Sequence, residues 1–171
     1  MTQLITDEYR KQNAALHADG SYGISGARYR EQVRPLADWG RHEILDYGCG
    51  SCTLAHSLGP AYTVHNYDPA LPEHSDPPEP CDIVTCTDVL EHIEPDLMDN
   101  VIADIRRLTK DKAFIAIALA KSSRTLDDGR NAHLSLHTVE EWRTMLEKHG
   151  FRIIDEKPTH RTVNLWWCVL E

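Results

Sequence analysis

The chain has 171 residues, of which 41% are hydrophobic and 26% charged, and its formal net charge is −9. This length favours a single domain, residues 1–171, able to bury about two-thirds of its unfolded surface. The acidic balance counts against nucleic acid and anionic membrane as partners. No apolar run approaches the ~20 residues of a membrane-spanning helix, so we expect no membrane association.

Residues 1–8 have neither the basic nor the apolar region of a signal peptide. Together with five cysteines, an odd number, this favours reduced thiols and a cytoplasmic location. Cys49 and Cys52 form a Cys-x-x-Cys pair, which allows a redox function. No second pair follows it, so we expect no structural zinc site.

Residues 1–40 are predicted to form an N-terminal helical segment ahead of a core at residues 41–171. Helical spacing over residues 6–17 begins at residues able to cap a helix. Residues 22–26 lie in a glycine-containing loop, which forms either a plain connection or part of a lid over a ligand. Residues 28–39 are again helical in pattern, with an interruption expected at a proline.

The most informative stretch is residues 43–54. A short apolar run predicts a buried strand that ends on Asp46, followed by Gly48, Gly50 and the start of a helix. Such a strand, tight turn and helix start bring backbone N–H groups close to a ligand. A nicotinamide dinucleotide site would need a third glycine at the position of Thr53, which counts against that class of oxidoreductase.

The pattern Asp46-x-Gly48-x-Gly50 resembles motif I of class I S-adenosylmethionine-dependent methyltransferases, with Cys52 in place of the third glycine. The resemblance continues at Asp68, which follows an apolar strand at residues 62–67. In that family an acid at this position accepts hydrogen bonds from the two ribose hydroxyls.

A third match is the run at residues 81–93, which resembles the family's fourth strand and its Asp-Val-Leu-Glu-His-Ile continuation. The resemblance implies a binding site for S-adenosylmethionine as the cofactor. The implied cofactor-binding residues are Asp46, Tyr47, Gly48, Cys49, Gly50, Asp68, Pro69, Thr87, Asp88 and Val89.

Residues 69–81 contain five prolines, which exclude an ordinary helix or central strand. Family members usually have a helix and a third strand here, and that strand carries an acid near the adenine. We therefore expect one strand and one helix fewer than the usual seven-stranded sheet, with Ser75 or Asp76 as substitutes near the adenine.

The remaining elements follow in regular alternation. They are a helix over 95–108, a strand over 113–120, a polar loop over 121–137, a capped helix opening at Thr138, and strands over 151–156 and 162–170. The predicted fold class is an α/β three-layer sandwich, with a Rossmann-like, mostly parallel sheet and a C-terminal antiparallel hairpin.

Methyl transfer requires alignment of the acceptor and, for a hydroxyl, removal of a proton. The catalytic candidates are His92 and His133 as bases, and Arg130 as a partner for an anionic acceptor. Asp88, Glu91, His92 and His133 also resemble the metal site of small-RNA 3′-terminal 2′-O-methyltransferases. Since Asp88 replaces the usual glutamate, a site without a divalent metal is favoured.

The leading prediction is a methyltransferase that transfers a methyl group to an oxygen or nitrogen atom of a small-molecule acceptor. One alternative is a metal-assisted nucleic-acid methyltransferase of the RNA 2′-O type. Another is a non-catalytic cofactor-binding subunit of a protein partner, and a homodimer is also open. One fold supports many functions, so the acceptor itself is not fixed by the resemblance.

Overall fold

The computed structural model describes residues 2–18, 20–37, 43–158 and 163–170, with side chains up to residue 157. The expected boundary between residues 40 and 41 lies outside the described residues. No helix among the described parts of the chain is long and apolar enough to cross a membrane.

Within the described residues, six strands form one sheet in the order β2-β1-β3-β4-β6-β5. Neighbours from β2 to β4 run parallel, β6 runs antiparallel to β4, and β5 runs antiparallel to β6. The strands are β1 (Glu43–Tyr47), β2 (Thr63–Tyr67), β3 (Cys81–Thr87), β4 (Thr109–Ala118), β5 (Phe151–Pro158) and β6 (Val163–Leu170). The Rossmann-like sheet with a C-terminal antiparallel pair is confirmed.

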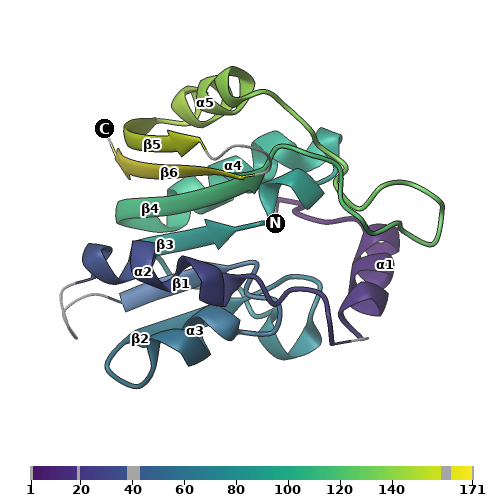
Figure 1. The fold of residues 1–171 in the computed structure, drawn as a ribbon, viewed down its shortest axis with the longest axis horizontal. Coiled ribbons are helices and arrows are strands. Elements are labelled where there is room, and N and C mark those ends of the chain that lie inside the picture. The colour runs from purple at the N-terminus through teal and green to yellow at the C-terminus, as the bar shows by residue number, and fades with distance from the viewer. Residues whose placement is uncertain (1, 19, 38–42, 159–162, 171) are drawn as a thin grey trace.

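Helices cover both faces of this sheet (Figure 1). The α-helices are α1 (Asp7–His17), α2 (Arg30–Val33), α3 (Thr53–Leu58), α4 (Met98–Leu108) and α5 (Val139–Lys148). The 3-10 turns are η1 (Gly26–Tyr29), η2 (Arg34–Leu36), η3 (Pro72–His74), η4 (Leu90–His92) and η5 (Pro95–Leu97).

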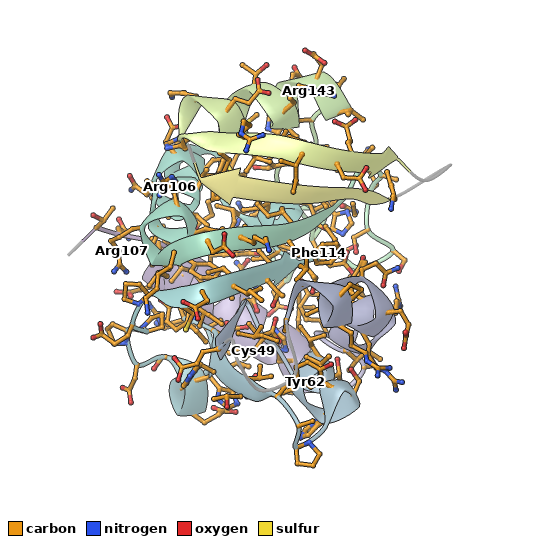
Figure 2. All side chains as sticks on the ribbon, turned by 90° about the vertical axis from the view of Figure 1, so that its left-hand side faces the viewer. Cys49, Tyr62, Arg106, Arg107, Phe114 and Arg143 are labelled. Carbon is orange, nitrogen blue, oxygen red and sulfur yellow. The ribbon has the colours of Figure 1, made fainter. Side chains whose placement is uncertain are left out.

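The two faces have separate hydrophobic cores. The apolar faces of α4 and α5 pack on one side of the sheet, where Ile102, Ile105 and Trp142 are fully buried. The turns η1 and η2 and the helices α2 and α3 pack on the other side, where Tyr29 contacts Phe114 of β4 at 5.8 Å between ring centroids. Figure 2 labels Phe114 on the sheet and Tyr62 farther down, toward β2. The structure is therefore the predicted three-layer sandwich.

Several element boundaries agree with the sequence pattern. Thr6 caps α1 by accepting a hydrogen bond from the N–H of Tyr9, and Thr138 and Glu141 form a reciprocal capping box at the start of α5. The helical stretch predicted over residues 28–39, with an interruption at a proline, is present in its described part as η1, α2 and η2. The change from α2 to η2 falls next to Pro35, which supplies no N–H to continue the α-helical pattern.

The proline-rich stretch between β2 and β3 behaves as expected. Its described residues form only the short turn η3, and no strand follows before Cys81. The sheet therefore lacks a strand beyond β2, as predicted.

One predicted strand boundary was wrong. Strand β4 starts at Thr109 rather than at residue 113, directly after α4.

Helix α1 lies beyond the carboxyl ends of the parallel strands, next to the loop after β4 (Figure 1). Gln12 of α1 donates to Asp128 of this loop at 3.1 Å between Nε2 and Oδ2. Ligands of open α/β sheets bind at the carboxyl ends of the strands. Helix α1 and the loop after β4 therefore lie next to the expected ligand site.

Candidate active site

A cavity of about 460 Å³ opens at the carboxyl ends of β1, β3 and β4. All ten residues predicted to bind the cofactor line it: Asp46, Tyr47, Gly48, Cys49, Gly50, Asp68, Pro69, Thr87, Asp88 and Val89. His92 and His133 line it as well. Arg130 is not among the lining residues, and its guanidinium pairs with Asp128 at 2.6 Å between Nη2 and Oδ2. The structure therefore brings together the predicted catalytic, cofactor-binding and metal-site residues, with Arg130 as the exception.

The loop after β1 depends on glycines that leave no room for a side chain. Gly50 has a φ of +48°, and a Cβ there would lie 2.6 Å from the carbonyl oxygen of Gly23. Gly48 has a φ of +75°, and its Cβ would meet Val89 at 2.4 Å. The N–H groups of Gly48 and Cys49 both donate to the carbonyl of Tyr67, which ties the loop to the end of β2.

Cys52 stands in the third glycine position and has a φ of +55°, in the left-handed region. This backbone shape explains why glycine is usual at that position. Here a cysteine adopts this left-handed backbone conformation, and the residue is buried at 8% exposure.

Asp68 is fixed by the backbone on both sides. Its Oδ2 accepts from the N–H of Gly50 at 3.2 Å, and its Oδ1 accepts from the N–H of Ala70 at 2.9 Å. A carboxylate has about four lone-pair sites, so these two bonds leave capacity for two more donors. The side chain is thus oriented in advance to accept a pair of hydroxyls.

Asp46 is buried at 3% exposure and accepts one hydrogen bond, from the hydroxyl of Thr85 at 3.0 Å. Burial raises the pKa of Asp46 to about 7, and the nearby Asp68 contributes to the rise. A cationic group in the cavity would favour the ionised form of Asp46 and so lower this pKa.

Three further groups meet at the far side of the cavity. Glu91, His92 and His133 have potential ligand atoms within 4.8 Å of one another, and the two imidazole rings lie 4.7 Å apart between centroids. Glu91 is fully buried; its Oε1 accepts from the N–H of Ala118, while its Oε2 has no partner among the described residues. Burial and the neighbouring Asp88 raise the pKa of Glu91 to about 8, so its neutral form dominates at pH 7.

Both histidines have one ring nitrogen next to a backbone carbonyl. His92 Nδ1 lies 2.8 Å from the carbonyl oxygen of Ala132, and His133 Nδ1 contacts that of Ala120. A carbonyl only accepts, so each Nδ1 carries the hydrogen and each Nε2 carries the lone pair. Burial lowers the pKa of His92 to about 4, which makes this imidazole a weak base.

The N-terminal segment completes the cavity wall. The hydroxyl of Tyr22 lies 2.9 Å from His92 Nδ1, and the carbonyl of Gly23 accepts from the N–H of Ser51 at 3.0 Å. Thr6 donates from its N–H and its hydroxyl to Glu94, at 2.9 and 2.7 Å. Residues 22–26 all line the cavity, so they lie where a lid would lie.

Sequence reasoning missed Tyr29 and Glu94. The Tyr29 hydroxyl donates to Asp88 Oδ1 at 2.7 Å, and Asp88 itself has a φ of +53°. Only a tertiary contact brings these residues together, so no local pattern signalled them. The suggested adenine contacts Ser75 and Asp76 are not among the lining residues of the cavity.

The sheet order, the glycine loop and the strand-end acids define the Rossmann-like fold of class I S-adenosylmethionine-dependent methyltransferases. The sequence profile of the methyltransferase domain matches residues 21–156. The chain therefore belongs to the methyltransferase domain family. No curated protein sequence matches the chain significantly.

Solved structures of the same fold include small-molecule methyltransferases. The chain is similar to Burkholderia thailandensis 1,6-didemethyltoxoflavin-N1-methyltransferase with bound 1,6-didemethyltoxoflavin and S-adenosylhomocysteine. The identity is 16% and the TM-score 0.74, and the match covers 99% of this chain and 92% of the other. It is also similar to magnesium protoporphyrin IX methyltransferase from Synechocystis PCC 6803 with bound S-adenosylhomocysteine, at 16% identity and a TM-score of 0.66, covering 88% and 83%. A third is a methyltransferase from Listeria monocytogenes described as S-adenosylmethionine dependent, at 13% identity and a TM-score of 0.61, covering 86% and 99%.

Proposed function

We propose that this methyltransferase binds S-adenosylmethionine and transfers its methyl group to an oxygen or nitrogen atom of a small-molecule acceptor. The observation that carries the proposal is one cavity in which a glycine loop and two strand-end acids, Asp46 and Asp68, face a Glu91–His92–His133 cluster. The two similar structures that contain S-adenosylhomocysteine support the choice of cofactor.

Each part of the cofactor has a chemically matched group. Asp68 would accept the ribose hydroxyls with its remaining lone pairs, and Asp46, once ionised, would attract the cationic amino-acid end of the cofactor. The sulfonium is already activated, so the chain's own contribution is alignment and proton removal.

We assign proton removal to His133 Nε2. Its Nδ1 is oriented by the carbonyl of Ala120, and the ring lies in the cavity wall beside Glu91 and His92. Burial lowers the pKa of His92, so this ring would instead shape the acceptor pocket with Tyr22.

A metal-assisted reaction is the second candidate, because Glu91, His92 and His133 lie close enough to share one ion. Asp88, the fourth residue of the family pattern, accepts from Tyr29 and is not part of this cluster. Methyl transfer that survives dialysis against a strong chelator would exclude this second candidate.

The first experiment is calorimetric titration with S-adenosylhomocysteine. We expect Asp68→Asn to weaken binding by about tenfold or more, since a lost charge-assisted hydrogen bond costs about 1.5–3 kcal/mol. Asp76→Asn is the matched control, because Asp76 is exposed and outside the cavity. Equal binding by wild type and Asp68→Asn would contradict the proposed cofactor site.

A further inference from the structure

A second cluster of reactive side chains lies behind the glycine loop. Cys49 and Cys52 belong to that loop, and His74 ends the turn η3 in the proline-rich connection. The Sγ atoms of the two cysteines lie 3.8 Å apart, and Cys52 Sγ lies 3.2 Å from His74 Nε2. The potential ligand atoms of all three residues fall within 4.8 Å of one another.

These separations match the spacing of ligands around a tetrahedral ion. With Zn–S bonds of about 2.3 Å, two thiolates on one Zn²⁺ lie roughly 3.8 Å apart, the separation found here. A thiolate and an imidazole nitrogen would lie roughly 3.5 Å apart, a few tenths of an ångström from the separation of Cys52 and His74.

An open hollow of about 630 Å³ borders the same cluster, and Cys52 and His74 are among its lining residues. His56 and Glu73 line it too. Cys49 lines the main cavity on the other side of the loop. The cluster is thus reachable from solvent without passing through the proposed cofactor site.

We propose that Cys49, Cys52 and His74 form a binding site for one Zn²⁺ ion, with a water molecule from the hollow as the fourth ligand. Two thiolates and one imidazole suit a borderline-soft ion better than Mg²⁺ or Ca²⁺, which prefer oxygen ligands. This site goes beyond the proposed function, since methyl transfer to a small molecule does not require it.

A bound divalent ion deprotonates its cysteine ligands, so zinc binding should release protons from the cluster.

The ion would join two segments that hold Asp68. The N–H of Asp68 donates to the carbonyl of His74 at 2.9 Å, and its carboxylate accepts from Gly50, next to Cys49. Binding would fix the glycine loop against η3 in a region that lacks the strand found in most of the family.

The test is titration of the reduced, full-length protein with Co²⁺ in the presence of a non-thiol reductant. We expect one Co²⁺ per chain, with a thiolate-to-cobalt charge-transfer band and the visible bands of a tetrahedral site, all lost when Zn²⁺ is added. Cys52→Ser should remove most of the charge-transfer intensity, and His74→Gln should weaken binding by about tenfold or more.

Two matched variants control for general effects. His56→Gln changes a histidine in the same hollow, and Cys86→Ala removes a core cysteine outside the cluster; both should bind Co²⁺ as wild type does. Circular dichroism establishes that each variant is folded.

Absence of a thiolate band in reduced wild type would overturn the proposal, as would equal binding by His74→Gln and wild type. A Cys49–Cys52 disulfide in the purified protein, combined with no Co²⁺ binding after reduction, would also overturn it and identify a redox pair. None of these outcomes depends on S-adenosylmethionine binding or on methyl transfer.

Discussion

At the scale of single residues, Gly50 and Gly59 form a natural pair for testing the loop. Both have positive φ, at +48° and +77°, but only Gly50 has a backbone atom in the way of a Cβ. Gly59 combines its positive φ with a ψ of −176°, a region essentially restricted to glycine, so Gly59→Ala should cost about 1–3 kcal/mol of folding free energy from backbone strain alone. Gly50→Ala should also weaken S-adenosylhomocysteine binding by about tenfold or more, because the loop must move away from Gly23.

Chemical denaturation measures the stability that each variant loses, and calorimetry measures its affinity for S-adenosylhomocysteine. If both variants lost the same stability and kept wild-type affinity, the contact between Gly23 and Gly50 would not matter for the cofactor loop.

The raised pKa of Asp46 leads to a pH dependence of cofactor binding. Burial lifts this pKa to about 7, and the ionised form is the one that attracts a cation. Affinity for S-adenosylhomocysteine should therefore rise between pH 6 and pH 8, by up to about tenfold, as Asp46 loses its proton. Asp46→Asn should bind more weakly and lose most of this pH dependence. Calorimetry at several pH values is the measurement, and a flat wild-type profile would contradict the assignment.

At the scale of elements, the N-terminal segment from Thr6 to η1 packs against the rest of the site. It lines the cavity and contacts the glycine loop through Gly23, His92 through Tyr22, and Glu94 through Thr6. Deleting residues 1–22 should weaken cofactor binding and lower turnover if these residues act as a lid. Tyr22→Phe serves as the smaller change, since it removes only the hydroxyl beside His92. Unchanged affinity and turnover after the deletion would show that the segment is a plain connection and not a lid.

The elements also show what the sequence was able to predict. The strand-end acids were predictable, because a buried strand followed by an acid is a local pattern, and parallel strands bring such ends together. The loss of a strand was predictable from the five prolines of residues 69–81. The contacts of Tyr29 with Asp88 and of Glu94 with Thr6 were not, since each joins residues 59 or more positions apart.

Arg130 is a predicted site residue that does not line the cavity. A loop arginine near a predicted site suggests an anion partner, but Asp128 lies two residues away and pairs with it. His74 was overlooked as a neighbour of Cys52 because 22 residues separate them, and only the fold of the proline-rich connection brings them together.

At the scale of the whole molecule, Glu91 links the site to stability. Its carboxyl keeps a proton in the folded state up to about pH 8, whereas an unfolded glutamate loses it near pH 4.5. Between these values the folded state binds more protons, so the stability contribution of Glu91 falls as pH rises. Asp46 acts in the same direction, while His92, with a lowered pKa, acts in the opposite direction below about pH 6.5.

Glu91→Gln should therefore nearly match wild type at pH 5 and exceed its unfolding free energy at pH 9 by about 4 kcal/mol. Glu79→Gln, at an exposed position, should change nothing at either pH. Denaturant titrations at both pH values give the answer. A Glu91→Gln variant less stable than wild type at pH 9 would mean that the buried carboxylate is paired in its charged form.

The shortened connection after β2 has a consequence for association between molecules. Among the described strands, β2 pairs only with β1, so it forms an edge of the sheet. An edge strand offers unpaired backbone groups to any extended segment and is a common starting point for aggregation. Here the edge is only five residues long, and Pro69 and Pro72 follow within five residues of its end. The prolines that shorten the sheet also limit the length over which another chain can pair with it.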